Sequence, residues 1–431
     1  MKRFVSKFTV ATTFALLAVG FAISAQRVSQ LPEAPAGFDG LTNGSVLQGA
    51  MDDALGQFQE VETPVPSGLG PVFNDVACVN CHQSQAVGGA AQVLEFRAGH
   101  NDNRRPSWFE ERRHRGDTNG STGTFVAATA ITANGTPIPN RSLINQRAIC
   151  PDAQEHLTDV DNIRATRLSL GLFGDAFVEA VPDAELLEIA SHNRGEAIMV
   201  DVLESPGTQE VGRFGWKTQH ASLLSFASDA YVNEMGITNR LNPTEATLVC
   251  QPTTGISIPN NPIQPVKPGD DDDIDTFTTF MRALKVPPRG PTAMTLEVTQ
   301  GEAIFIRIGC ADCHVKTMTT ARAGTFIHGG TYMLSDAIGG KQFHPFGDFL
   351  LHDIGTGDGI VQNGPPDTQY KVRTMPLWGL RTRTQFLHDA SAGTFSEAIE
   401  RHEHEAADDA FNFRRLGPTD KRLLLRFLGS L

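Results

Sequence analysis

Apolar residues recur at the spacing of an α-helix in several parts of this 431-residue chain. Near the C-terminus, Leu424, Phe427, Leu428 and Leu431 fall on one helical face, and Pro418 is a typical first residue of a helix. The same spacing predicts helices over residues 162–172, 183–191, 275–284 and 295–308. These segments favour a mainly α protein.

Residues that break regular structure separate these segments. Pro, Gly, Asn and Thr crowd residues 116–142 and 251–270, which are predicted to be long irregular loops. Prolines and a glycine within 286–291 exclude a regular element, so a domain boundary is expected there. The acidic run Asp270–Asp273 is interpreted as a solvated turn. The alternative, a calcium loop, lacks the spaced ligands of an EF-hand.

The N-terminus has the pattern of a secretory signal. Lys2, Arg3 and Lys7 precede a mostly apolar stretch over residues 8–23, and small residues follow before position 26. Residues 1–25 are therefore predicted to be a signal peptide, with an uncleaved anchor as the alternative. No other stretch approaches the roughly 18 apolar residues of a membrane helix, so no membrane span is expected after cleavage.

The charge of the chain narrows the choice of partners. The formal net charge is −13, and it becomes −16 without residues 1–25. So acidic a protein is a poor partner for nucleic acid or an anionic membrane. It would suit a small basic redox protein that donates or accepts electrons, although a solvated acidic surface explains the charge equally well.

Two segments have the form Cys-x-x-Cys-His, the attachment signal for c-type haem. They are Cys78, Cys81 and His82, and Cys310, Cys313 and His314. Each thiol can add to one vinyl group of the porphyrin, and the following histidine then becomes an iron ligand. A single match could be a zinc or redox cysteine pair. Two matches in an exported chain predict two covalent haems and the bacterial periplasm.

The motifs lie 232 residues apart, which is too far for one cytochrome c fold. We therefore predict two cytochrome c-like haem domains, 26–287, enlarged by insertions, and 292–431. In the second domain, the helix before the motif is expected to cross the C-terminal helix, with Phe305 against Phe427. Cys150 and Cys250 remain, either as a disulfide or as two buried thiols.

Further segments, in order around these motifs, resemble one enzyme family. They are residues 68–74, 212–217, 233–238, 348–355, 373–380 and 386–389. Together they resemble the bacterial di-haem oxidoreductases, relatives of the di-haem cytochrome c peroxidases, over about residues 40–431. The chain departs from the family pattern at Ala390-Ser391, where Gly-Arg is usual, and at Met375, where Pro is common.

The resemblance implies that the two irons divide the labour. One haem would bind peroxide at an open or weakly held position, while the other, six-coordinate, relays electrons. For the first haem, Glu234 matches the distal acid–base residue and Trp216 matches a tryptophan between the haems. The alternatives are a surface carboxylate for Glu234 and core packing for Trp216. No histidine follows His82 before His100, so a five-coordinate or water-bound iron is expected.

For the second haem, His402 stands where the relatives supply a methionine ligand, and it is the predicted sixth ligand. The alternatives are an exposed helix residue at His402, or ligation by Met318 or Met333. The residues expected to support this haem, through ring N–H groups or a bond to a propionate, are His352, His388 and Arg373.

The leading hypothesis for function is a periplasmic di-haem oxidoreductase with peroxidase-type chemistry. Its expected partners are a peroxide or another small oxidant and a small redox protein. One alternative is a non-catalytic electron-transfer cytochrome, and another is an accessory redox protein, for example in metal uptake. The fold alone cannot choose among them.

Overall fold

The computed structural model describes residues 31–64, 67–101, 125–127, 130–132, 135, 137–138, 141–250 and 272–431. Residues Pro32–Leu431 form one compact unit. The predicted signal peptide lies outside the described residues, as do Asp270 and Asp271 of the acidic run. Within the described ranges, no helix is both long and apolar enough to span a membrane.

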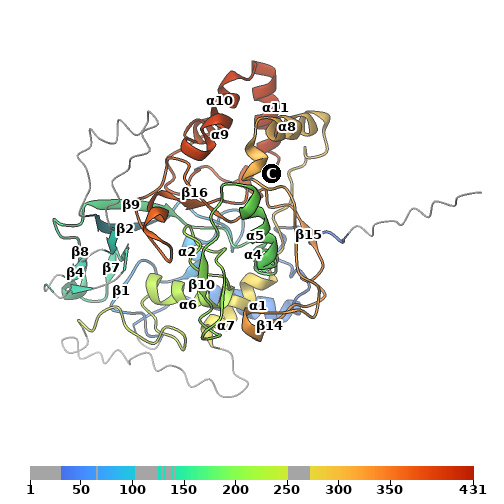
Figure 1. The fold of residues 1–431 in the computed structure, drawn as a ribbon. Coiled ribbons are helices and arrows are strands. Elements are labelled where there is room, and N and C mark those ends of the chain that lie inside the picture. Colours follow the sequence, from blue (N-terminus) through green and yellow to red (C-terminus); the bar gives the residue numbers. More distant parts are fainter. Residues whose placement is uncertain are drawn as a thin grey trace, which may run out of the picture. The chain divides into compact units, whose positions relative to one another are not determined.

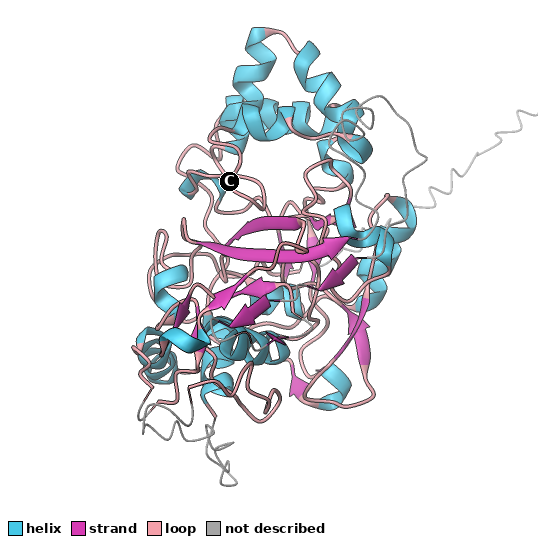
Figure 2. Cartoon of the chain, turned by 90° about the vertical axis from the view of Figure 1, so that its left-hand side faces the viewer, coloured by secondary structure: helices cyan, strands magenta, loops and turns pink. Residues whose placement is uncertain are grey.

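The α-helices fall into two groups (Figure 1). The lower group in this view, which includes the first motif at α2, contains α1 (Gln48–Gln59), α2 (Cys78–Cys81), α4 (Asp175–Glu179), α5 (Asp183–His192), α6 (Leu223–Glu234) and α7 (Asp273–Ala283). The group near the second motif contains α8 (Leu296–Arg307), α9 (Phe395–Glu400), α10 (Ala407–Arg415) and α11 (Pro418–Leu428). Figure 2 shows strands lying between helices.

The strands are short and numerous. They are β1 (Val72–Phe73), β2 (Leu94–Asn101), β3 (Phe125–Ala127), β4 (Ala130–Thr132), β5 (Pro137–Ile138), β6 (Leu143–Ile144), β7 (Arg147–Ala148), β8 (Glu155–His156), β9 (Ile163–Leu168), β10 (Met199–Asp201), β11 (Gln209–Val211), β12 (Met318–Thr319), β13 (Phe326–Ile327), β14 (Tyr332–Met333), β15 (Gln342–Phe343), β16 (Leu351–His352) and β17 (Val372–Arg373).

These strands make the prediction of a mainly α fold wrong. The described residues combine helices with several small sheets, the largest formed by β2 with β3, β6 and β9. Most strands have only two or three residues and pair with distant segments, as β1 does with β7. So short a strand has no measurable hydrophobic period, and its partner is chosen by tertiary contacts.

Tertiary contacts also decide the structure of residues 162–172. This segment was predicted to be a helix, but most of it is strand β9. It pairs antiparallel with β2 from Leu94 opposite Leu168 to Gly99 opposite Ile163. The Arg167 side chain is buried and lies 2.6 Å from the Asp358 carboxylate. A buried arginine requires such a partner. Asp358 is far along the chain, so the residues around Arg167 do not show that this arginine has a partner and can be buried. The sequence pattern near Arg167 therefore could not indicate a buried strand.

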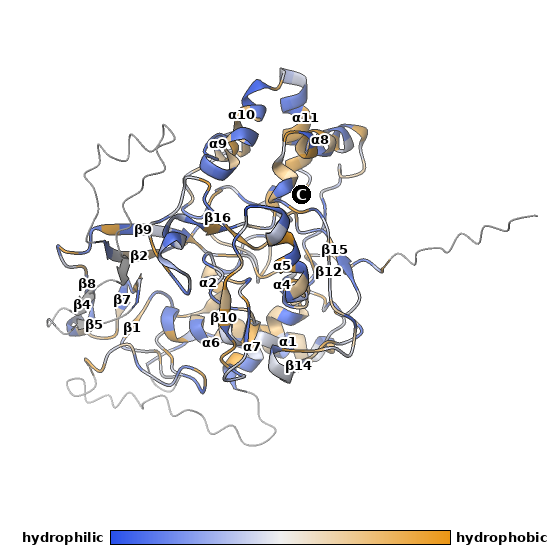
Figure 3. Ribbon diagram, in the orientation of Figure 1, coloured by the Kyte–Doolittle hydropathy of each residue, from blue (hydrophilic) through white to orange (hydrophobic). Residues whose placement is uncertain are grey.

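The other predicted helices are confirmed as α5, α7, α8 and α11. Helix α7 buries Ile274, Phe277 and Phe280 on one side, and its apolar positions are visible in Figure 3. Helices α8 and α11 pack together as predicted, with the Phe305 and Phe427 ring centroids 5.3 Å apart. A Cβ at Gly301 would collide with the Leu423 carbonyl, so this glycine permits the close crossing.

Two separate apolar clusters lie beside the two motifs. Phe58, Phe277 and Phe280 belong to the larger one, against which Cys78 packs. Phe305 and Phe427 belong to the other, against which Cys310 packs. The larger cluster also takes in residues beyond position 292, namely Met318, Phe343 and Trp378. The two-domain division with a boundary near 287 stays a prediction.

A disulfide joins Cys150 to Cys250, with the Cα atoms 6.0 Å apart. Of the two alternatives left open for these residues, the structure shows the disulfide. The four cysteines of the motifs take part in no disulfide.

Candidate functional site

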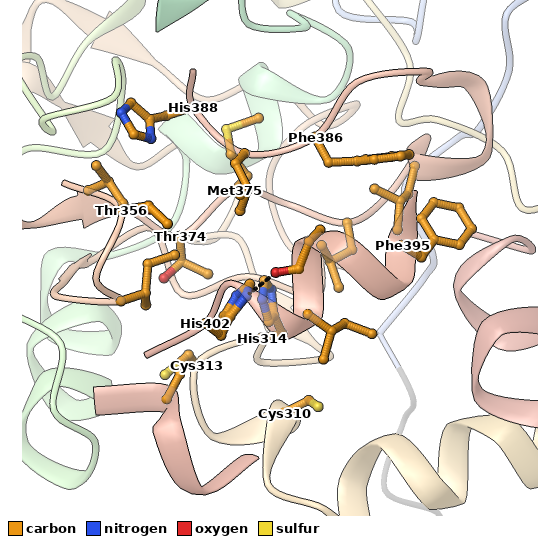
Figure 4. Close-up of a pocket in the computed structure, with 18 of the residues that line it drawn as sticks. Cys310, Cys313, His314, Thr356, Thr374, Met375, Phe386, His388, Phe395 and His402 are labelled. Atoms are coloured by element: carbon orange, nitrogen blue, oxygen red, sulfur yellow. Dashed lines mark hydrogen bonds between the residues drawn. The ribbon is translucent and has the colours of Figure 1, made fainter. Parts of the chain in front are cut away.

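The second motif opens directly off the end of α8. Gly309 has a φ of 106°, which a residue with a side chain rarely adopts, and the one-turn 3-10 helix Cys310–Asp312 follows it. Cys310, Cys313 and His314 then line a cavity of about 180 Å³ (Figure 4). Burial raises the pKa of Cys310 to about 12, so this thiol is protonated at neutral pH.

His314 is oriented as a ligand would be. Its Nδ1–H donates to the Phe346 carbonyl at 2.9 Å, which leaves Nε2 as the free ring nitrogen. Burial, with a smaller effect of His402, lowers the pKa of His314 to about 4. The ring is therefore neutral at neutral pH, the form that binds a metal.

His402 follows helix α9 and points into the same cavity (Figure 4). Its Nδ1–H donates to the Ala398 carbonyl at 2.7 Å, so Nε2 is again the free nitrogen. His404 turns away and pairs with Asp353 at 2.8 Å. Met318 and Met333 do not line the cavity, and Met333 is half exposed. The structure thus brings His402 and His314 together, while ligation by His402 stays a prediction.

Several buried polar atoms of this cavity have no hydrogen-bond partner among the described residues. They are Thr356 Oγ1, Arg373 Nε, Gln385 Oε1 and His388 Nδ1. Burial also lowers the pKa of both Arg373 and Arg383, which line the cavity, to about 10. No described carboxylate lies within ion-pair distance of either guanidinium.

An anionic group would accept from the donors among these atoms, above all Arg373 Nε, and the two propionates of a haem have that chemistry. The thiols, the free Nε2 atoms, the apolar wall and the arginines all fit this cofactor. Arg373 and His388 were expected here. Arg383 was missed, because nothing in the run Arg381-Thr382-Arg383 separates a buried arginine from an exposed one.

His352, expected to support the second haem, lies at the edge of the same cavity. Its Nε2 lies 2.9 Å from Asp348 and its Nδ1 lies 3.0 Å from Glu405. Burial lowers the pKa of His352, but the bonds to Asp348, Cys313 and Glu405 outweigh that effect and raise it to about 12. The ring is therefore a cation beside the Cys313 sulfur, 3.7 Å from Nδ1.

The first motif forms the one-turn helix α2 and lines a second cavity of about 350 Å³. The His82 Nδ1–H donates to the Leu170 carbonyl at 2.8 Å. Burial lowers the pKa of His82 to about 4, so it also presents a neutral Nε2. Among the described residues that line this cavity, His82 is the single histidine. His100 lies elsewhere and bonds to the Val160 carbonyl.

Glu234, at the C-terminal end of α6, lines this first cavity. Its Oε2 accepts a hydrogen bond from Asn74 Nδ2 at 2.6 Å. Burial, followed by the nearby Glu95 carboxylate, raises the pKa of Glu234 to about 8. Glu234 is therefore no simple surface carboxylate.

Glu95 is a cavity residue that sequence reasoning missed. The acid–base pair Glu95-x-Arg97 has the spacing of neighbours on one face of a strand. This weak signal could have been noticed only after β2 was recognised.

Trp216 lies in a wall shared by the two cavities. It lines both of them, as does Leu168, and its indole Nε1–H donates to the Leu168 carbonyl at 2.7 Å. The Trp216 and His388 ring centroids are 6.0 Å apart. Trp216 is thus a buried residue of the wall between the two cavities, and its place between two haems stays a prediction.

Among the described residues, no group of three or more His, Cys, Asp or Glu side chains could hold a metal ion, whereas structural zinc takes four such ligands. Asp272 pairs with Arg240, and Asp273 accepts a hydrogen bond from Tyr231. Asp270 and Asp271, the rest of the acidic run interpreted as a solvated turn, lie outside the described residues.

Comparison with protein families identifies the chain. Residues 146–431 match a family model described as "Di-haem oxidoreductase, putative peroxidase". The chain belongs to this family. The matched region of this di-haem oxidoreductase contains the second motif, Trp216, Glu234 and His402, while the first motif precedes it.

Two solved structures are similar to this di-haem oxidoreductase. One is the hydrazine synthase of Kuenenia stuttgartiensis under xenon pressure, at 14% identity and a TM-score of 0.31, covering 62% of this chain and 73% of that one. The other is a MauG-like protein associated with microbial copper homeostasis, at 17% identity and a TM-score of 0.25, covering 37% and 52%. Both TM-scores are too low to support an argument about fold or function. No curated protein matches.

Proposed function

We propose that this di-haem oxidoreductase reduces hydrogen peroxide or a related small peroxide in the periplasm, with electrons from a small redox protein. One observation carries the proposal. Among the described lining residues, the first cavity has one imidazole whose Nδ1 is bonded to a backbone carbonyl, from His82, and an acid–base carboxyl, whereas the second has two such imidazoles, from His314 and His402. Such a difference suits a reactive site and an electron-relay site.

Haem bound in these cavities would supply an iron that exchanges electrons and, where one axial position is open, binds peroxide. In the first cavity, Glu234 would give its proton to one peroxide oxygen and regain a proton from the other. Because its pKa is raised to about 8, close to neutral pH, Glu234 can both hold and release a proton. Asn74, which donates to Glu234 at 2.6 Å, would fix the direction of the carboxyl.

Trp216 would shorten the electron path between the sites, because its indole belongs to both walls. The Trp216 carbonyl also accepts a hydrogen bond from the Arg373 backbone N–H at 2.8 Å. This bond ties the tryptophan segment to β17, whose Arg373 side chain would face a propionate in the second cavity.

The site of action and the partner rest on the sequence. The basic, apolar N-terminal segment supports export, and covalent haem attachment suits the periplasm. The charge of −16 outside that segment supports a basic partner protein, whose association would weaken as ionic strength rises.

The test combines haem counting, spin state and turnover. The purified protein should contain two haems that stay attached after denaturation. Electron paramagnetic resonance should show one high-spin and one low-spin ferric signal, and the protein should consume hydrogen peroxide with a reduced small cytochrome. Two low-spin signals without peroxide consumption would reject the proposal in favour of an electron carrier.

A further inference from the structure

Glu95 gives the first cavity a second carboxyl group, in contact with the first. It lies on β2, and Glu234 ends α6, so two distant segments bring the side chains together. Both groups line the cavity and lie close enough to each other to share a hydrogen bond. Two carboxyl groups can make this contact only if one of them carries a proton.

Arg97 decides which of the two stays ionised. Its Nε and Nη2 donate to the two oxygens of Glu95, at 2.8 Å and 3.0 Å. Glu234 instead receives a neutral amide N–H from Asn74. One guanidinium therefore compensates one negative charge, and this charge is held on the Glu95 side.

Other charged groups act on the pair from neighbouring segments. Arg167 on β9 and Arg141 act on Glu95 and Glu234 respectively, and Asp229 on α6 acts on Arg97. Cys81 of the first haem motif lies near Glu234. Asp75 and Arg147 are the other charged groups near this thiol. The pKa of Glu95 is lowered because Arg97 outweighs its burial, while burial and Glu95 raise the pKa of Glu234 to about 8.

We propose that Glu95 and Glu234 form one proton-sharing pair in the first cavity, in which Glu95 is a positioning residue that keeps a proton on Glu234. The sharing itself depends only on this chain's residues. Its use in turnover rests on the proposed function. There, the pair would give one proton to the outer peroxide oxygen and regain one from the inner oxygen, so it carries one proton before and after.

Infrared difference spectroscopy on the resting haem protein tests the sharing without peroxide. The parent spectrum minus that of Glu234→Gln should isolate a carboxylic-acid C=O band, present at pH 7 and lost with a midpoint near 8. Glu95→Gln removes the like charge and frees Arg97, so the midpoint should fall by about one pH unit or more. Arg97→Gln removes the compensating charge, so the midpoint should rise.

Glu245→Gln is the matched control. Glu245 is also a half-buried acid whose pKa burial raises, to about 7, but it does not line the cavity. This variant should lose a band of its own and leave the Glu234 midpoint unchanged. An unchanged haem absorption spectrum in each variant shows that the cavity is intact, and if Glu95→Gln fails to fold, Arg97→Gln carries the test.

Two results would overturn the pair. One is the absence of an acid band from Glu234 in the parent at pH 7, and the other is a midpoint that neither Glu95→Gln nor Arg97→Gln moves. The peroxide reaction supplies a second readout: its rate should fall above about pH 8 in the parent, and this alkaline limb should move down in Glu95→Gln. If the parent ignores peroxide, the proposed function fails while the infrared titration still decides the pair.

Discussion

Replacement of Glu234 by Gln removes the ability to transfer a proton in the first cavity and keeps the shape of the side chain. The amide has nearly the size of the carboxyl, so its oxygen can still accept from Asn74, now 2.6 Å from Oε2. Its NH₂ group can donate a hydrogen bond to Glu95, and this bond replaces the one made by the shared proton. Because both neighbours keep a partner, the free energy of unfolding should change by only about 1 kcal/mol.

The reaction with peroxide should change far more. A positioned acid–base group contributes roughly 10²–10⁴-fold to a proton-transfer step, or about 3–5 kcal/mol of activation free energy. We therefore expect the second-order rate constant for the haem spectral change with hydrogen peroxide to fall by about two orders of magnitude or more. The expected loss is large because the pKa of about 8 matches the working pH.

Stopped-flow absorbance over a range of peroxide concentrations measures this rate constant. The resting spectrum, the haem content and the thermal midpoint of Glu234→Gln should match those of the parent, and Glu245→Gln serves as the control for loss of a buried acid elsewhere. A Gln variant that reacts as fast as the parent would show that Glu234 does not move the proton.

Three further perturbations address the second cavity and the fold. His402→Ala should turn the low-spin ferric signal high-spin, because a free Nε2 is lost; an unchanged low-spin spectrum would reject His402 as a ligand. Phe427→Ala should lower the free energy of unfolding by about 3–5 kcal/mol in denaturant titrations, since the ring is fully buried; a loss below about 1 kcal/mol would contradict this packing. Burial lowers the pKa of His328, but bonds to Glu179 and Glu210 outweigh it and raise the pKa to about 9. The protonated ring should therefore stabilise the fold fully below about pH 6.5 and lose this effect as pH rises through 9. Thermal midpoints of the parent and His328→Gln should converge at high pH, and a constant difference would refute the linkage.

The amino-acid sequence by itself determined the features that depend on neighbours along the chain. The Cys-x-x-Cys-His motifs are local chemistry, and they do line the two cavities. Helices α7, α8 and α11 follow from apolar periodicity over three turns, and the contact between Phe305 and Phe427 followed from α8 and α11. Because the motifs leave just Cys150 and Cys250, the sequence offered a disulfide or two buried thiols, and the structure decided for the disulfide.

Only the tertiary structure decided the sheets and the chemistry of the cavity walls. Strands of two or three residues have no period to detect, and β9 owes its form to pairing with β2. Glu95 becomes an acid–base candidate because β2 meets the end of α6, and Arg383 becomes a candidate propionate partner because burial leaves it without a carboxylate. Trp216 joins the two cavities because β9 places the Leu168 carbonyl at its indole. In each case the energy of the group depends on a neighbour distant in the chain, which no local pattern encodes.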